Sequence, residues 1–431
     1  MRQKCISIEK CYCIILMILM ASMIIVPVSY QKHKMLILVI LCGGVFYSVV
    51  KRKCYIPIDI VRVLLLYILY NTVSVVIGIT TSAPGAVRVT STEIVWPILF
   101  VVLFLAFPAI NVIDYVFTGI ILGMWVVSLM DFALLMTAYG IFPLQIEWFT
   151  QIDLGYYVNP AGHAFTSGHM VSYLYGIPFV AGLLIVEKKK RFSYMLLLAF
   201  ELFNIFLSGR RAMFLLVGLL PVFGILIYRY IRNKGFKKYR IVSRLSKNQT
   251  FILTLACVFG VCVIYYSKNY IIFLLDTLLE GFEFKNAANP DAHIRGIQFS
   301  ALMKGWLEHP LFGNGAGSYT IECIRSEEQL WAYELSYCAL LFQKGLIGAG
   351  LFLNLVIHAY RSSKKKIQKN KYFLKYCYPV LMGMTGVLIG NATNPYLGKF
   401  SCIWYLFLAV SLSGMLNFKN KDTSEIFSKT N

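Results

Sequence analysis

Charged residues are scarce in this chain, and acidic residues especially so. Asp and Glu together number 20 among 431 residues, charged residues make up 14% and apolar residues 58%. A soluble domain is nearer half apolar and a quarter charged, so this composition excludes an ordinary water-soluble fold. Apolar runs long enough to cross a bilayer recur from end to end, and lipid forces each run to satisfy its backbone polar groups within a helix. We therefore expect an all-α polytopic membrane protein.

Several functional motifs are also missing. The 11 cysteines form no Cys-x-x-Cys pair, and most lie inside apolar runs, as Cys257 and Cys377 do, where cysteine behaves as a small hydrophobe. No histidine pair has metal-ligand spacing, and no Asp-x-Asp pair lies in a predicted outer segment. These absences argue against a metal- and nucleotide-dependent transferase, and we expect no metal and no cofactor. The halves share no repeat, which disfavours a transporter.

Basic residues are abundant and give a formal net charge of +21. In a soluble chain this excess would suggest nucleic acid as a partner. Here the lysines and arginines cluster between apolar runs, which is typical of the positive-inside rule and of contact with anionic headgroups, so no nucleic acid is expected. The runs predict about twelve spans. They cover residues 11–30, 35–50, 58–79, 94–109, 112–139, 170–186, 192–208, 211–230, 250–267, 336–359, 374–391 and 398–416.

The distribution of these basic residues sets the orientation. An even number of spans places both termini on one side, and most lysines and arginines fall on that side, above all in the predicted loops 231–249 and 360–373. Cytoplasmic segments carry such an excess, so both termini are predicted to be cytoplasmic. The first run is long and lacks a cleavage site, which favours an uncleaved first helix. We expect residues 1–431 to form a single integral membrane domain.

The longest hydrophilic stretch, residues 268–335, lies between the predicted ninth and tenth spans and therefore outside the cytoplasm. Asn289 suits a helix cap and Pro290 the first helical position. Apolar residues then recur with helical spacing up to Trp306. We predict a helix over about 290–308 that lies on the membrane surface, with Trp306 at the headgroup level.

A glycine-rich segment, "GNGAG" from Gly313 to Gly317, follows that helix. It resembles a phosphate-binding loop, but it follows no strand and lacks the Lys-Ser/Thr pair. We interpret it as a turn in which glycine lets two backbone segments come close together.

Two adjacent arginines, Arg210 and Arg211, lie at the short turn that joins the predicted spans 192–208 and 211–230. The orientation puts this turn outside, against the charge trend, where a cation near hydrocarbon costs a few kcal/mol. These arginines could extend to the outer headgroups. They could also bind a ligand, because the planar fork of a guanidinium suits a phosphate or a diphosphate.

Other ionisable side chains lie at the predicted outer ends of spans. His163 and His169 precede the span at 170–186, and Glu334 precedes the span at 336–359. Each could accept a proton from a hydroxyl group. The alternatives are a helix cap or an interfacial anchor for a histidine, and a solvated acid at a helix start for Glu334.

Two acidic residues lie inside predicted spans. Asp131 and Glu201 are costly in lipid, so we expect both to face the interior of the bundle. A structural role is expected for both, and Glu201 could pair with an arginine or a lysine.

Four short motifs follow one another in the chain: "TSGHMVSYL", "FLSGRRAMFL", "RGIQFSALMKGWLEHPLFGNGAGSY" and "ELSYCALLFQKGLIGAGL". The first is similar to a Glu-Pro-x-His-x-x-x-Tyr-Leu signature and the second to a Ser-Gly-x-Arg turn. The third is similar to an Arg…Trp…His-Pro-Leu-x-Gly-x-Gly-x-Gly stretch, and the fourth to a segment from His-Asn to Gly-x-x-Gly. These motifs, taken with their order and their predicted side of the membrane, resemble those of the O-antigen polymerase and O-antigen ligase superfamily. The first motif is most similar to that of the capsular repeat-unit polymerases in this superfamily.

The resemblance implies a GT-C-like, metal-independent inverting glycosyltransferase at the outer face of the bacterial plasma membrane. Its donor would be a glycan on undecaprenyl diphosphate. Glu334 stands where that family has its catalytic histidine, so His169 and Glu334 are both candidates for the base. The residues expected at the substrate are Arg210, Arg211 and Arg295 for the diphosphate, together with His163, His309 and Tyr337.

Three functions remain open at this stage. The first is a polysaccharide polymerase for capsule or exopolysaccharide, which would act on lipid-linked repeat units. The second is an O-antigen-ligase-like transferase to a wall or lipid acceptor, and the third is a lipid-linked oligosaccharide flippase. The expected partners are the lipid-linked oligosaccharide, the bilayer, a chain-length regulator and a separate flippase.

Overall fold

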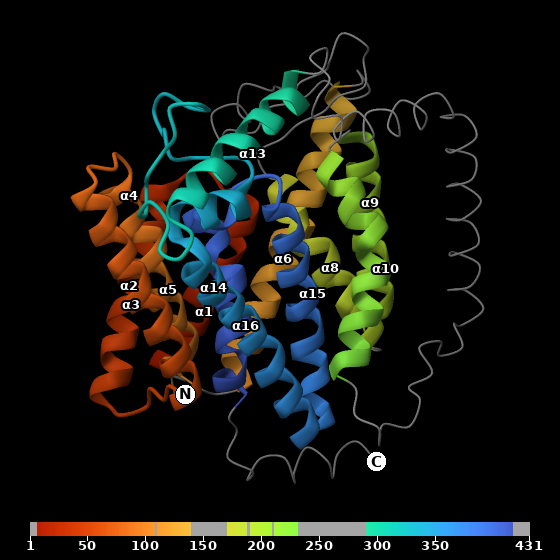
Figure 1. Cartoon of the computed structure of the whole chain (residues 1–431). Coiled ribbons are helices and arrows are strands. Elements are labelled where there is room, and N and C mark those ends of the chain that lie inside the picture. Colours follow the sequence, from red (N-terminus) through yellow and green to blue (C-terminus); the bar gives the residue numbers. More distant parts are fainter. Residues whose placement is uncertain are drawn as a thin grey trace, which may run out of the picture.

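The computed structural model describes residues 7–107, 110–138, 170–187, 190–208, 211–231 and 290–416. All regular structure in these ranges is helical (Figure 1). The α-helices are α1 (Ile8–Ile25), α2 (Gln31–Val50), α3 (Ile58–Thr80), α4 (Ala86–Thr90), α5 (Trp96–Leu105), α6 (Ile110–Ala138), α8 (Met170–Val186), α9 (Arg191–Ser208), α10 (Arg211–Ile231), α13 (Pro290–Glu308), α14 (Ser336–Lys369), α15 (Leu374–Asn391) and α16 (Phe400–Met415). The shorter elements are the π-helical turn η1 (Ser91–Val95) and the 3-10 turns η2 (Lys371–Phe373) and η3 (Tyr396–Gly398).

Within the described residues, 8 helical segments are long and apolar enough to cross a membrane, and α8 and α16 are shorter apolar helices. The chain is therefore a polytopic α-helical membrane protein, as its composition predicts. The span predicted over 250–267 lies outside the described residues, as does the predicted loop 231–249 apart from Ile231, the last residue of α10. The count of twelve spans remains a prediction.

The prediction of a loop over 360–373 is wrong. Helix α14 continues from the membrane span through this basic segment as far as Lys369, and a 3-10 turn follows at once. Lysine, arginine and glutamine are good helix formers, and the segment contains no glycine or proline to end the helix. Lys366 and Lys369 in the last turn also complement the negative end of the helix dipole.

The core of the bundle lies around α8, α15 and α16. Tyr175 of α8 and Trp404 of α16 are fully buried there, with ring centroids 5.3 Å apart. Asp131 and Glu201 are also fully buried, which confirms that both face the interior. The carboxylate oxygens of Glu201 accept no hydrogen bond from any described residue.

Helix α13 has the bounds that the cap pattern predicts, Pro290–Glu308. It lies across the upper end of the bundle in Figure 1, above the start of α14. Leu302 of α13 packs into a small apolar cluster with Ala339 and Phe342 of α14. This cluster attaches the segment between α13 and α14 to the helices below it.

The glycine-rich turn after α13 brings backbone segments into close contact, as interpreted from the sequence. Gly313, Gly315 and Gly317 all have positive φ. A Cβ on Gly313 would lie 2.5 Å from the carbonyl carbon of Gln343, and a Cβ on Gly315 would lie 2.5 Å from the backbone nitrogen of Gly78. Only glycine tolerates both the left-handed backbone and the lack of room for a Cβ atom at these positions. The glycines therefore let the turn pack directly against the backbone of α14 and of α3.

Candidate functional site

A cavity of about 250 Å³ lies where α3, η1, the start of α14 and the junction of α15 with α16 meet. Its walls combine aromatic rings with polar groups, which is typical of sites for small polar ligands. The aromatic residues are Tyr67, Trp331, Tyr333, Tyr337 and Phe352, and the polar residues include Glu93, Gln343, Lys344, Asn391 and Lys399.

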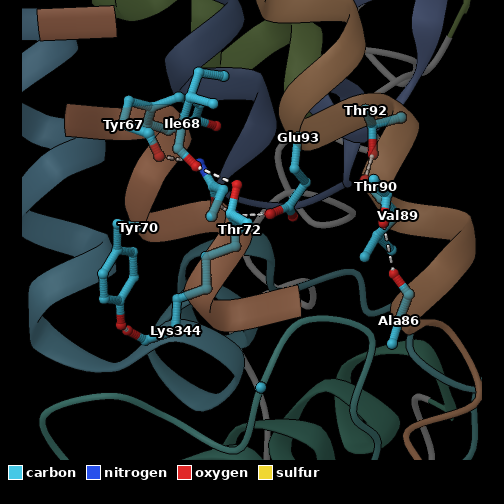
Figure 2. A network of polar contacts seen from close by, with 12 residues as sticks. Tyr67, Ile68, Tyr70, Thr72, Ala86, Val89, Thr90, Thr92, Glu93 and Lys344 are labelled. Carbon is cyan, nitrogen blue, oxygen red and sulfur yellow. Dashed lines mark hydrogen bonds and ion pairs between the residues drawn. The ribbon is translucent and has the colours of Figure 1, made fainter. Parts of the chain in front are cut away.

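A buried ion pair lines this cavity. Lys344 is only 6% exposed, and its ammonium group pairs with the carboxylate of Glu93 and donates a hydrogen bond of 2.7 Å to Asn71 Oδ1. Figure 2 shows Lys344 and Glu93 in one polar network that joins α14, η1 and α3. Burying an ammonium group without a partner costs several kcal/mol of desolvation free energy, so Lys344 is stable here because Glu93 pairs with it.

The backbone at both members of the pair is irregular. Glu93 lies in the π-helical turn η1, and turns of this kind re-aim side chains and occur often at functional sites. Lys344 precedes Gly345, whose φ of 60° interrupts α14. The hydroxyl of Tyr70 donates a hydrogen bond to the Lys344 carbonyl at this kink. The two charges therefore face each other because both helices depart from regular geometry.

One oxygen of the ion pair has unused hydrogen-bonding capacity. Glu93 Oε2 is buried and faces the Lys344 ammonium, but it accepts no hydrogen bond of good geometry from the described residues. A hydrogen bond from a hydroxyl group to a buried carboxylate oxygen without a partner is energetically favourable. Glu93 is also a lining residue of the cavity, and its side chain is 17% exposed.

A second charged cluster stands beside the cavity. Glu334 Oε2 accepts a hydrogen bond of 2.9 Å from Arg295 Nε, and Glu334 Oε1 accepts one of 2.5 Å from Arg325 Nη2. The carboxylate therefore holds two guanidinium groups together, and one positive charge is left uncompensated within the cluster. The side chain of Arg295 is 21% exposed and that of Arg325 is 38% exposed, so both arginine side chains remain accessible in part.

The cluster and the cavity are connected through the chain itself. Tyr333 and Ser336 line the cavity, and Glu334 lies between them in the sequence. Gln298 of α13 accepts a hydrogen bond of 2.8 Å from the backbone nitrogen of Leu335, which fixes this segment. Burial raises the pKa of Tyr333 to about 12, so its hydroxyl stays neutral at physiological pH and is unsuited to act as a base.

The structure brings together three of the residues expected at the site. Arg295 and Glu334 form the charged cluster, and Tyr337 lines the cavity, where its hydroxyl donates a hydrogen bond of 2.6 Å to the Leu388 carbonyl. His309 is exposed and lines a separate cavity of about 310 Å³ with the end of α3. His309 therefore does not join the cluster.

The remaining expected residues cannot be placed with the others. His163, His169 and Arg210 lie outside the described residues. Arg211 is the first residue of α10, and its side chain lies outside the described part of the chain. Their roles remain predictions.

Sequence reasoning missed Glu93, Lys344 and Arg325. A signal was present for Lys344, because a lone lysine within an apolar run is a candidate functional residue in a membrane protein. Glu93 stands at the edge of a predicted span, where an acidic residue is ordinary. Arg325 lies in a segment without periodicity, so nothing in the sequence indicates that it pairs with Glu334.

Among the described residues, no group of three or more His, Cys, Asp or Glu side chains is placed to hold a metal ion. No protein-family model matches the chain, and no curated protein matches it.

Proposed function

We propose that this chain is a polysaccharide polymerase of the bacterial plasma membrane. It transfers a growing glycan from undecaprenyl diphosphate to a sugar hydroxyl of a lipid-linked repeat unit, outside the cytoplasm. The observation that carries the proposal is the pair of guanidinium groups on Glu334, beside a cavity with aromatic and polar walls, at one end of a bundle of apolar helices. A lipid-linked donor in the bilayer would present its diphosphate at such a position.

The arginines suit the leaving group. In this transfer the bond from the anomeric carbon to the diphosphate oxygen breaks, and negative charge grows on the diphosphate. Cations that are already in place stabilise that charge without reorganisation. Arg295 and Arg325 are held in place by Glu334, and the family resemblance adds Arg210 and Arg211.

The cavity suits a sugar. A volume of about 250 Å³ is near the lower end of the usual range for small-molecule sites and is enough for a single ring. The aromatic rings can cover the C–H faces of the sugar, and the Glu93 carboxylate, which lines the cavity, can accept a hydrogen bond from a hydroxyl group. We assign the cavity to a sugar adjacent to the reacting bond.

The reaction also needs a proton acceptor. The acceptor hydroxyl oxygen forms a bond to the anomeric carbon with inversion, its proton goes to a base, and the diphosphate leaves with the bonding electrons. His169 and Glu334 are the two candidates for the base. Both carboxylate oxygens of Glu334 already accept hydrogen bonds from arginines, so Glu334 also positions the cations.

The test is the length of the polysaccharide in cells that depend on this chain for polymerisation. Arg325→Gln should shorten the chains to one or a few repeats, because losing one charged donor to a transition state costs roughly 100-fold or more in rate. Lys304→Gln is the matched control, since it removes a cation from an exposed ion pair with Glu322 on the same segment. Normal long chains in Arg325→Gln, at normal protein levels, would sink the proposal.

A further inference from the structure

A separate cavity of about 240 Å³ lies between the start of α3 and the late part of α14. Arg361 in this cavity lies roughly 25 Å along α14 from Lys344 of the candidate functional site, at a rise of 1.5 Å per residue. Asp59 and Arg62 of α3 and His358, Arg361 and Lys365 of α14 are among its lining residues. This end of the bundle is the one predicted to face the cytoplasm.

The cavity exists because α14 continues as a helix through its basic segment. His358, Arg361 and Lys365 are spaced by three and four residues, which places them on one helix face. That face meets α3, which contributes Arg62. In a loop these side chains would have no common direction.

The charges in this cavity are not balanced by the protein. Arg62, Arg361 and Lys365 are three cations, and Asp59 is the one carboxylate among the lining residues. Within the described part of the chain, no ion pair involves these three cations, whereas Lys53, Lys304 and Lys344 each pair with a glutamate.

A hydrogen-bonding group is also unused. His358 Nε2 is buried and has no hydrogen-bond partner among the described residues. Like charges gathered in one cavity repel one another unless an anion joins them. The side chains of the three cations are exposed, so an anion can reach them, and the cavity has the electrostatic character of an anion site.

The surroundings of the cavity are apolar and exposed. Val61 is 38% exposed and Leu65 52% exposed along α3, and Leu353 of α14 is 56% exposed. Leu65 follows Arg62 in the direction of the span, and Leu353 precedes the lining residue Asn354 on the same side, so an acyl chain would run beside these two side chains. A phosphate that carries acyl chains would satisfy the cations and cover this apolar surface together.

We propose that this cavity binds the phosphate of an anionic phospholipid. The phosphate lies among Arg62, Arg361 and Lys365, and the acyl chains lie along α3 and α14. The site is distinct from the candidate functional site and does not depend on the proposed function.

The test uses the full purified chain in a neutral detergent. The midpoint of thermal unfolding is followed as phosphatidylglycerol, phosphatidylcholine or inorganic phosphate is added, and the shift of the midpoint reports binding to the folded state. The test variant combines Arg62→Gln, Arg361→Gln and Lys365→Gln. The control variant combines Lys10→Gln, Lys51→Gln and Lys369→Gln, which are exposed lysines outside the cavity.

Phosphatidylglycerol should stabilise the wild type and the control, and the test variant should bind it about 100-fold more weakly, at roughly fivefold per cation removed. Equal stabilisation of test and control variants would overturn the site. Inorganic phosphate as effective as phosphatidylglycerol would overturn the lipid as the source of the phosphate.

A gain-of-affinity variant guards against misfolding of the test variant. Asp59→Asn removes the carboxylate that opposes the phosphate, so it should raise the affinity for phosphatidylglycerol several-fold. A misfolded protein cannot show this gain. Unchanged or weaker binding in Asp59→Asn would overturn the proposal.

Discussion

Replacing Lys344 by methionine removes the ammonium group of the buried ion pair and keeps the length and most of the volume of the side chain. The Glu93 carboxylate then has no cation, and Asn71 Oδ1 loses its hydrogen-bond donor. Both groups are poorly placed to recover these partners from water, because the Glu93 side chain is 17% exposed and Asn71 is 1% exposed.

The expected magnitude follows from these losses. Removing one partner of a buried pair costs about 3–5 kcal/mol, of which the unsatisfied buried amide oxygen supplies about 1–3 kcal/mol. The residual exposure of Glu93 lets water screen part of the charge, so we expect about 3 kcal/mol for Lys344→Met. The double variant Glu93→Gln with Lys344→Met leaves no unpaired charge and should cost only about 1 kcal/mol.

The assay is equilibrium unfolding in mixed micelles with increasing sodium dodecyl sulfate, followed by the fluorescence of the 6 tryptophans. Comparing the single variants with the double variant isolates the interaction between the two side chains. We expect Lys344→Met to be the least stable and the double variant to recover at least about 2 kcal/mol of the loss. Strictly additive effects, or a loss below about 0.5 kcal/mol in Lys344→Met, would refute the reasoning about this pair.

Three further predictions concern the glycine-rich turn, the charged cluster and a buried thiol. Gly315→Ala should destabilise the protein, because the φ of +92° at Gly315 and the nearby backbone of Gly78 leave no room for a side chain. Gly350 lies in open space, so Gly350→Ala should stabilise the protein by up to ~1 kcal/mol. Thermal unfolding of the two variants tests both effects. Glu334→Gln should weaken the hold on both guanidinium groups and lower the polymerisation rate at least tenfold, and an unchanged rate would remove Glu334 from the site. Burial raises the pKa of the Cys323 thiol above its ordinary value, so less thiolate is present at pH 8 in the folded protein. Maleimide should therefore label Cys323 more slowly in the folded than in the unfolded protein. The labelling rate of the folded protein should rise as the pH increases.

The helices could be predicted largely from the sequence, because lipid leaves a long apolar run no alternative to helical hydrogen bonding. Helix α13 could be predicted from the cap residues Asn289 and Pro290 and the apolar spacing that follows. The segment 360–373 was misassigned for a physical reason. Hydropathy shows where a helix leaves the membrane, but lysines and arginines can continue the same helix in water.

The candidate site could be predicted only in part. Glu334 stands out because it precedes the span predicted at 336–359, and Arg295 and Tyr337 are expected from the family resemblance. The pairing of Lys344 with Glu93 depends on a kink at Gly345 and on a π-helical turn, and neither has a distinct sequence signal. The link from Arg325 to Glu334 depends on how an irregular segment folds back, which local patterns do not specify.

The most direct test of the proposed function uses the purified chain in lipid nanodiscs, given a single repeat unit on undecaprenyl diphosphate and nothing else. The chain should convert this substrate into a ladder of longer glycans on the carrier, and Arg295→Gln should reduce the rate roughly 100-fold while Lys304→Gln leaves it unchanged. Elongation by wild type and control but not by Arg295→Gln is the result we predict. A wild-type protein that is folded and monodisperse but leaves the repeat unit unextended, or an Arg295→Gln variant that extends it at the normal rate, would contradict the proposal.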